Sequence, residues 1–132
     1  MDVINFAQNK VESEIPLVPS SLYPDRDMKQ LSPADLRNWT ASGRIFTLVD
    51  VREPWEHELF NIGGLLLPMG DLMAGQGALE KDRPVVFYCE KGIRSVIAIQ
   101  RMESLGFDNL YNLAGGMKAW RESEQAISQR GA

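Results

Sequence analysis

Short apolar segments alternate with helix-like segments along this chain, and that alternation constrains the fold more than any other feature of the sequence. The segments at residues 45–51 (IFTLVDV) and 84–88 (PVVFY) are dominated by β-branched, aromatic and other apolar side chains. Nearly continuous hydrophobicity is typical of parallel strands that are covered on both faces of a sheet. The sequence therefore predicts an α/β fold with a mostly parallel central sheet.

Helix boundary residues separate these predicted strands. Ser32 followed by Pro33 is a typical helix start and Gly43 a typical helix stop, so we expect a helix over residues 33–41. Gly106 similarly ends a later helical segment. The other predicted elements are a buried strand at residues 65–67, a strand at 110–113, and helices at 55–59, 93–105 and 117–127.

The length and the proline content indicate how the chain is divided. With 132 residues, 44% of them hydrophobic, it is long enough to build one hydrophobic core. Three prolines near the N-terminus, Pro16, Pro19 and Pro24, would interrupt regular structure there. We therefore expect an N-terminal extension over residues 1–26, one domain over residues 27–128 and a short tail over residues 129–132.

Composition argues against several classes of function. The chain has 18 acidic and 14 basic residues, so nucleic acid is not an expected partner. No apolar run approaches the roughly 18 residues of a membrane-spanning helix, and the N-terminal residues do not resemble a signal peptide. One cysteine and one histidine offer neither a disulfide nor a recognisable metal-ligand spacing. We expect a cytoplasmic protein with no metal, no cofactor and no membrane partner.

The strand predicted at residues 84–88 delivers Cys89 to the carboxyl edge of the sheet, where open parallel sheets usually bind ligands. The sequence that follows is CEKGIRS, in which Gly92 permits a tight turn just before a predicted helix. Peptide N–H groups that curl toward one point, together with a helix N-terminus, attract an anion. Such a position favours the thiolate, which makes Cys89 a candidate nucleophile.

The side chains of this loop carry mixed charge. Lys91 and Arg94 could hold an anionic donor, whereas Glu90 offsets part of their charge. The alternative interpretation is an unreactive cysteine, because a single free cysteine is often a small buried hydrophobic residue. A merely packed cysteine has no need of an adjoining glycine turn, two cations and a helix start, so we favour the reactive interpretation.

Three motifs together resemble the rhodanese family. Residues 48–56 (LVDVREPWE) are similar to its first-strand motif, residues 89–95 (CEKGIRS) to its active-site loop, and residues 110–120 (LYNLAGGMKAW) to its C-terminal motif. The resemblance extends over about residues 30–124 and keeps the three motifs in the family's order. It implies a rhodanese-like fold, in which a five-stranded parallel sheet is flanked by helices on both faces.

The resemblance also implies a chemistry and a set of site residues. Cys89 matches the cysteine that takes sulfane sulfur from a small anionic donor, thiosulfate or a persulfide, and passes it as a persulfide to an external thiol, cyanide or a protein acceptor. Arg52 matches an Asp-x-Arg motif, in which a pairing with Asp50 is the preferred role and reception of the anionic donor the alternative. No cofactor is implied. The substrate-binding candidates are Arg52 and the loop residues Glu90, Lys91, Gly92, Ile93, Arg94 and Ser95.

Several conspicuous residues receive structural interpretations. We expect Gly115 and Gly116 to form a tight turn, and Trp39, Trp55 and Trp120 to pack in the core. His57 lies between glutamates in a segment that looks exposed, so we expect it on a solvated helix face and assign it no catalytic role.

Two other functions remain open. A cysteine phosphatase or arsenate reductase would use a similar anion cradle, but those enzymes typically space cysteine and arginine as C-x5-R, whereas Cys89 and Arg94 are spaced as C-x4-R and Ser95 occupies the next position. A rhodanese-like sulfur-relay or partner-binding module would turn over little thiosulfate. The presence of Cys89 favours a carrier of sulfur over a purely docking module.

Overall fold

The structure is a computed structural model that describes residues 28–131, so the expected N-terminal extension lies outside the described residues. One sheet of five parallel strands, in the order β1-β5-β4-β2-β3, forms its centre. The predicted α/β fold is confirmed. The strands are β1 (Lys29–Leu31), β2 (Thr47–Asp50), β3 (Leu65–Leu66), β4 (Val85–Tyr88) and β5 (Leu110–Leu113).

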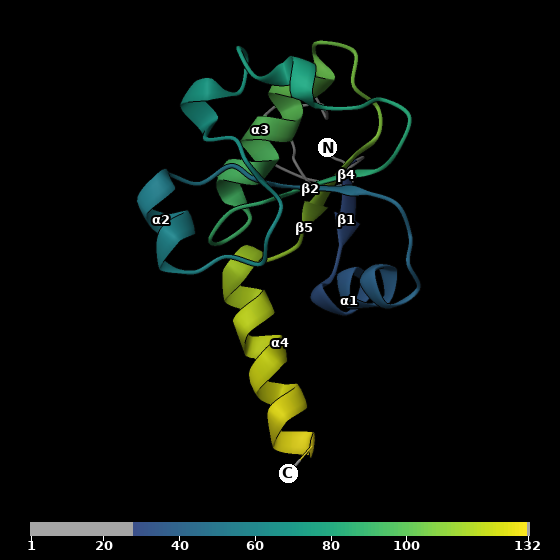
Figure 1. Ribbon diagram of the computed structural model, residues 1–132, viewed down its shortest axis with the longest axis vertical. Coiled ribbons are helices and arrows are strands. Elements are labelled where there is room, and N and C mark those ends of the chain that lie inside the picture. The colour runs from purple at the N-terminus through teal and green to yellow at the C-terminus, as the bar shows by residue number, and fades with distance from the viewer. Residues whose placement is uncertain (1–27, 132) are drawn as a thin grey trace, which may run out of the picture.

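Helices cover both faces of this sheet, as the family resemblance implied (Figure 1). On one face lies α3 (Ile93–Glu103), and on the other lie α1 (Pro33–Ala41) and the first turns of α4 (Gly116–Gly131). The short α2 (Pro54–Leu59) follows β2. Two 3₁₀ turns, η2 (Met69–Asp71) and η3 (Gln76–Ala78), lie between β3 and β4. Among the described residues, no helix is both long enough and apolar enough to cross a membrane.

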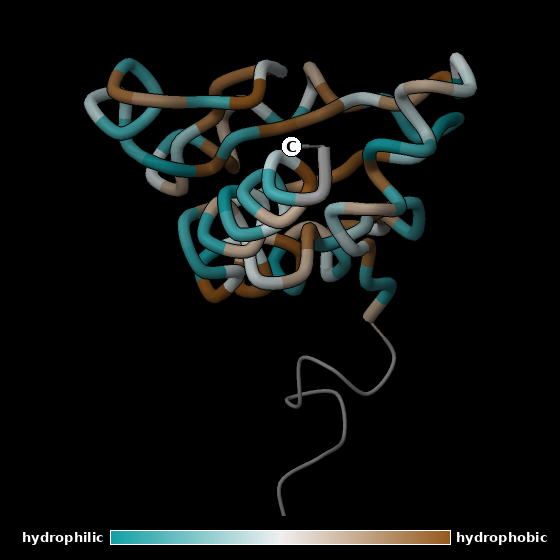
Figure 2. Tube along the Cα trace, turned by 90° about the horizontal axis from the view of Figure 1, so that it is seen from below, coloured by the Kyte–Doolittle hydropathy of each residue, from teal (hydrophilic) through white to brown (hydrophobic). Residues whose placement is uncertain are grey.

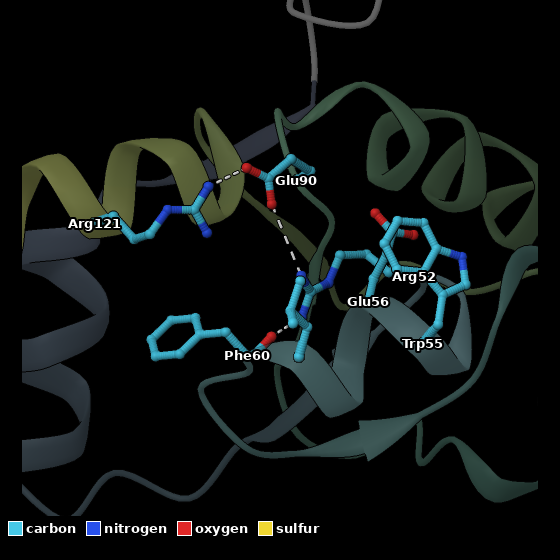
Figure 3. A pocket seen from close by; sticks show the side chains of 7 residues that line it. Arg52, Trp55, Glu56, Phe60, Glu90 and Arg121 are labelled. Carbon is cyan, nitrogen blue, oxygen red and sulfur yellow. Dashed lines mark hydrogen bonds and ion pairs between the residues drawn. The ribbon is translucent and has the colours of Figure 1, made fainter.

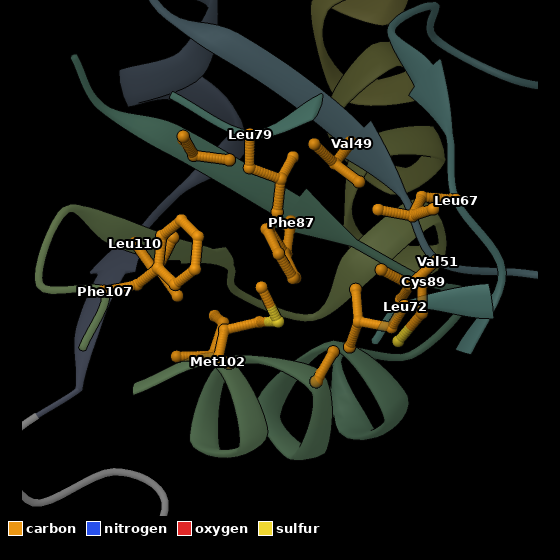
Figure 4. Packing of buried hydrophobic residues seen from close by; sticks show 13 residues of the cluster. Val49, Val51, Leu67, Leu72, Leu79, Phe87, Cys89, Met102, Phe107 and Leu110 are labelled. Atoms are coloured by element: carbon orange, nitrogen blue, oxygen red, sulfur yellow. The ribbon is translucent and has the colours of Figure 1, made fainter. Parts of the chain in front are cut away.

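The central position of β4 in the sheet explains why the sequence of this strand is continuously apolar. Val85 and Phe87 pack with α3 on one face, in the cluster drawn in Figure 4, whereas Val86 and Tyr88 pack with α1 and α4 on the other. All four residues are buried. Because successive side chains of a strand point to opposite faces, a strand covered on both sides needs apolar residues at every position. Cys89 follows directly and belongs to the α3-side cluster.

Helix α1 forms over the predicted residues, and its start is fixed by a reciprocal cap. The hydroxyl of Ser32 accepts the Asp35 N–H at 3.0 Å, and the Asp35 carboxylate accepts the Ser32 N–H at 3.3 Å. Two otherwise unpaired donors of the first turn are thereby satisfied. The prediction of a helix over residues 33–41 is confirmed.

The edges of the sheet differ from the prediction. No apolar pattern predicts β1, because two of its residues, Lys29 and Gln30, are polar and exposed. At the opposite edge, the strand predicted at residues 65–67 is present as β3 but is only two residues long. Leu67 is buried, whereas Leu65 is 39% exposed, so the prediction of burial is wrong for Leu65. Edge strands have one neighbour and need less hydrophobicity than central ones.

Helix α4 is longer than predicted and continues to Gly131, so residues 129–131 of the expected tail belong to it. Its first turns pack against the sheet through Met117, whereas residues 124–129 are exposed. Figure 2 looks along this helix and shows hydrophilic residues around much of it. In Figure 1 the same helix projects well beyond the sheet.

Candidate active site

The sulfur of Cys89 lies at the carboxyl end of β4 and is surrounded by hydrogen-bond donors. It accepts the backbone N–H groups of Gly92 at 3.1 Å and Ser95 at 3.3 Å, and it lies 3.3 Å from the Ser95 hydroxyl. Ser95 is the third residue of α3, where the N–H has no partner within the helix. The cysteine sulfur therefore caps α3, and it does so while only 1% of Cys89 is exposed.

The start of α4 holds the outer side of the same loop. Met117 N–H donates to the Cys89 carbonyl and Lys118 N–H to the Glu90 carbonyl, both at 2.9 Å. Gly116 makes this approach possible, because a Cβ there would overlap the Cys89 carbonyl oxygen and lie 2.7 Å from that of Glu90. The start of α4 thus holds the outer side of the loop, whereas the Gly92 and Ser95 N–H groups donate to the sulfur on its inner side. The predicted turn at the glycine pair is present, with φ of +74° at Gly115 and +61° at Gly116.

Gly92 is the second position at which only glycine fits. Its φ is +88°, in the left-handed region that favours glycine, and a Cβ would lie 3.1 Å from the Gly115 backbone nitrogen. The two glycine motifs of the sequence thus touch each other across the site. The sequence predicts a local turn at each motif, but no local pattern indicates this contact.

Behind the sulfur, a buried polar chain leads away from Cys89. The Ser95 hydroxyl donates to Asn112 Oδ1 at 2.5 Å, and Asn112 Nδ2 donates to Gln30 Oε1 at 3.0 Å. Ser95 is fully buried and Asn112 is 3% exposed. Asn112 was not among the predicted site residues. The signal in the sequence is an amide side chain within the otherwise apolar strand β5.

Arg52 has the structural pairing that the sequence analysis preferred. Its Nε and Nη2 atoms lie 3.0 and 2.9 Å from the two carboxylate oxygens of Asp50, and Nη2 also donates to the Phe60 carbonyl at 2.6 Å. Burial alone would lower the pKa of Arg52, but the bonds to Asp50 raise it above its ordinary value. Arg52 is 3% exposed, and its bonds to Asp50 and to the Phe60 carbonyl tie β2 to the end of α2.

His57 is not on a solvated face, and that prediction is wrong. Its Nδ1 lies 2.8 Å from Asp50 Oδ2, and its side chain is 21% exposed. The buried carboxylate of Asp50 thus serves both His57 and Arg52. Within residues 28–131, no three histidine, cysteine, aspartate or glutamate side chains meet as a metal site would require.

Arg94 is bound to a carboxylate and not directed at the sulfur. Its two terminal nitrogens donate to Glu56 at 2.7 and 2.8 Å, which joins the first turn of α3 to α2. These bonds lower the pKa of Glu56 to about 2, and the same pair raises the pKa of Arg94. This arrangement does not favour the phosphatase alternative, in which an arginine would bind the oxyanion beside the cysteine.

A hollow of about 360 Å³ lies beside the loop (Figure 3). Glu90 stands between two of its arginines: one carboxylate oxygen lies 3.8 Å from Arg52 Nη1, and the other contacts Arg121 of α4. Trp55 lines this hollow and is 66% exposed, so its predicted place in the core is wrong. Trp39 and Trp120, in contrast, pack against the α1 and α4 side of the core. The hollow is lined by Arg52, Trp55, Glu56, Leu59, Phe60, Glu90 and Arg121.

The two remaining loop residues point outward. Ile93 is 64% exposed, and Lys91 is exposed and has no ionic partner among residues 28–131. Of the predicted loop set, Cys89, Gly92 and Ser95 meet at the sulfur, Glu90 and Arg94 form ion pairs around it, and Lys91 and Ile93 face solvent.

The site is thus a thiol at the end of the central parallel strand of an α/β fold, where two backbone N–H groups donate to the sulfur. Residues 32–123 match the rhodanese-like domain model. The chain belongs to the rhodanese-like family, and the resemblance found in the sequence is confirmed.

Individual relatives agree with this assignment. The probable adenylyltransferase/sulfurtransferase MoeZ of Mycobacterium tuberculosis is 38% identical over 98 residues, which are 72% of this chain and 25% of MoeZ. The chain thus spans about a quarter of that relative. The thiosulfate sulfurtransferase GlpE of Coxiella burnetii is 33% identical over 79 residues, 59% of this chain and 74% of GlpE. The human single-domain sulfurtransferase TSTD1 has a similar structure, with a TM-score of 0.60 at 32% identity, covering 70% of this chain and 95% of TSTD1.

Proposed function

We propose that this chain is a sulfurtransferase in which Cys89 carries sulfane sulfur as a persulfide. The observation that carries the proposal is the pair of backbone N–H groups, from Gly92 and Ser95, that donate to the Cys89 sulfur. A cysteine that only fills the core needs no donors, whereas a thiolate or a persulfide anion is stabilised by them. Relatives that are named sulfurtransferases, including GlpE and TSTD1, support the same reaction class.

The reaction is a double displacement at sulfur. The Cys89 thiolate attacks the outer sulfur of thiosulfate, a new S–S bond forms, and the bond to the departing sulfite breaks with its electron pair. The persulfide anion then gives its outer sulfur to cyanide, which leaves as thiocyanate, or to a thiolate, which becomes a persulfide. In both steps the negative charge stays near the two N–H donors, which are already oriented before the reaction.

A persulfide acceptor must come from outside this sequence, because it contains one cysteine. No second thiol is present to resolve the Cys89 persulfide within the chain. A small thiol or the thiol of a protein partner would therefore take the sulfur.

The pairing of the site's cations supports a second candidate, a sulfur relay with little turnover on thiosulfate. Arg94 is neutralised by Glu56, and Arg52 and Arg121 share Glu90. Lys91 is then the cation of the loop that has no ionic partner among residues 28–131 and is free to attract a dianion. A donor that brings its own contacts, such as a protein persulfide, would depend less on these charges.

The test is the intact mass of the reduced protein after brief exposure to thiosulfate, followed by cyanide, with Cys89→Ser as the control. A gain of one sulfur on the wild type alone, released as thiocyanate, is the expected result. If thiosulfate adds nothing but a small-molecule persulfide loads Cys89, the relay form is supported. If neither donor adds sulfur to Cys89, the proposed function is wrong.

Lys91→Ala tests the choice of donor. We expect loading from thiosulfate to slow by about threefold, the size of one exposed charge interaction, while alkylation by uncharged iodoacetamide is unchanged. Lys81→Ala is the matched control, because Lys81 precedes β4 and so lies at the amino-terminal end of the strands, away from the carboxyl end that carries Cys89. If both variants lose the same share of the loading rate, Lys91 has no specific role in attracting the donor.

A further inference from the structure

The Ser95 hydroxyl lies between two groups that compete for its single proton. It is 2.5 Å from Asn112 Oδ1 and 3.3 Å from the Cys89 sulfur. A serine hydroxyl can donate one hydrogen bond and accept others. In the observed arrangement the proton goes to Asn112, so the hydroxyl can only accept from Cys89. That suits a thiol, whose S–H can donate, and does not suit a thiolate.

A contact on its other side orients the Asn112 amide. Asn112 Nδ2 donates to Gln30 Oε1 at 3.0 Å, which leaves Oδ1 turned toward Ser95. Gln30 is on β1 and its residue is exposed, whereas Asn112 is buried on the adjacent strand β5. A hydrogen-bond chain of defined direction therefore runs from Cys89 through Ser95 and Asn112 to the protein surface.

We propose that Asn112 is a positioning residue for Cys89, which holds the resting cysteine as the thiol by taking the proton of Ser95. The proposal rests on the proposed function of Cys89 as the nucleophile. When the thiolate forms, Ser95 must turn its hydroxyl proton to the sulfur, and Asn112 Oδ1 then loses its donor in a buried place. An unsatisfied buried acceptor is unfavourable, so Asn112 restrains thiolate formation until substrate or pH overcomes it.

Charged side chains lie on the elements around the loop, and the test variants leave all of them in place. They belong to β2 and the residues after it, α2, the loop, α3 and α4, and the relevant ones are Asp50, Arg52, Glu56, His57, Glu90, Lys91, Arg94 and Arg121. A change of the thiol's behaviour in the variants below therefore comes from the hydrogen-bond chain and not from a lost charge.

The pH profile of Cys89 alkylation by iodoacetamide measures the effect, because only the thiolate reacts and the midpoint of the profile is independent of overall accessibility. We expect Asn112→Leu to lower this midpoint by about one pH unit, the size of one hydrogen bond, and to speed alkylation below it about tenfold. A purely structural role would change the rate at every pH and leave the midpoint in place. An unchanged midpoint would overturn the proposal.

A double variant tests whether Asn112 acts through Ser95. In a Ser95→Ala background there is no hydroxyl proton to compete for, so adding Asn112→Leu must leave the midpoint unchanged. If the same shift persists without the hydroxyl, Asn112 acts by another route and the proposal is wrong.

A surface variant keeps the proposal testable if Asn112→Leu does not fold. Gln30→Leu removes the acceptor that orients the Asn112 amide, so Asn112 can rotate and donate to Ser95, and the midpoint should fall in the same direction. Gln30→Glu is the matched control, because it keeps an acceptor for Asn112 Nδ2, and high salt screens its added charge. Equal midpoints in these two variants would contradict the proposal.

Failure of this inference can be told from failure of the proposed function. Sulfur loading of wild-type Cys89 from thiosulfate or a persulfide tests the function, whereas the alkylation profiles need no sulfur donor. A protein that loads sulfur but shows no midpoint shift in the variants would retain its function without the role we assign to Asn112.

Discussion

Two regions of the site meet at the same loop and are built in opposite ways. The floor, which consists of Cys89, Gly92 and Ser95, offers the sulfur two neutral donors from buried backbone N–H groups, and the Ser95 hydroxyl lies 3.3 Å from the sulfur. The rim is made of ion pairs in which Arg52 is buried and the other side chains are partly exposed, and its members are Arg52, Glu56, Glu90, Arg94 and Arg121.

This difference indicates that the floor stabilises negative charge on the sulfur, whereas the rim influences which reagents reach it. Backbone donors on the floor are fixed by the fold, do not titrate and are little affected by salt, so they can stabilise an anionic sulfur from any donor. The rim's charges largely cancel one another and are open to screening. We infer that changes to the floor should affect every reaction of Cys89, whereas changes to the rim should affect charged reagents selectively.

The largest effect is expected from Gly116→Ala, which breaks the floor from outside. A Cβ at this position would overlap the Cys89 carbonyl and so displace the loop that carries the sulfur. We expect sulfur loading to fall more than a hundredfold and the free energy of unfolding to fall by about 2–4 kcal/mol. Loading measured by intact mass and unfolding by urea would check both.

Gly43→Ala is the matched control for Gly116→Ala. Its φ of +73° imposes a similar backbone strain, of about 1–2 kcal/mol, but a Cβ there meets no atom within 4 Å. Its loading should remain normal. If both variants lose loading equally, backbone strain and not contact with the loop explains the loss.

A second prediction concerns the strongest pair of the rim. Glu56→Gln should lower the free energy of unfolding by about 1–2 kcal/mol at pH 7, because it removes a two-bond pair with Arg94. The pKa of Glu56 is lowered from 4.5 to about 2 in the folded state, so its contribution is complete above about pH 4.5 and is lost as the pH falls toward 2. The difference from wild type should disappear over that interval.

Urea unfolding of wild type and Glu56→Gln at several pH values between 7 and 2.5 would measure this. Glu122→Gln is the control, because Glu122 pairs with Lys118 where both side chains are about 60% exposed, and such a pair contributes little. A difference for Glu56→Gln that is the same at pH 7 and pH 2.5 would contradict the assigned role of the pair.

Glu90→Gln should sharpen the distinction between floor and rim. Removing this carboxylate leaves Arg52 and Arg121 without their shared partner, so anionic reagents should reach Cys89 about fivefold faster. Iodoacetate and iodoacetamide are nearly the same size and differ in charge, and the ratio of their alkylation rates reports this effect. Glu58→Gln, at an exposed position of α2, is the control. If only the iodoacetamide rate changes, Glu90 does not act through the charge of the reagent, and the assignment of Glu90 to the rim is wrong.

Local sequence signals predicted most of the framework. Continuous hydrophobicity identified β4, and the Ser32–Pro33 start identified α1, because burial on two faces and helix capping both act through neighbouring residues. The loop after β4 was found for the same reason, since a strand end, a glycine and a helix start are adjacent in the chain.

Contacts between distant segments were missed because no local pattern encodes them. Arg94 and Glu56 are 38 positions apart, so the pairing that neutralises a predicted donor-binding cation could not be deduced from spacing. Ser95 and Asn112 meet only because α3 packs against β5. Edge strand β1 was missed for a different reason, because one neighbour is enough for a strand whose own residues are polar.

The smallest effect is expected from substitution of Trp55, a residue whose helical spacing predicted burial but whose side chain is exposed. Its helical position predicts burial in the core, but α2 has no buried residue, and Trp55 lines the rim's hollow. We expect Trp55→Ala to change the free energy of unfolding by no more than about 0.5 kcal/mol and to leave the iodoacetamide rate unchanged. Trp39→Ala, which removes edge-on contacts with Phe46 and Tyr111, should cost about 2–3 kcal/mol. A similar loss in both variants, measured by urea unfolding, would mean that α2 supports the core and that rim and floor are not independent.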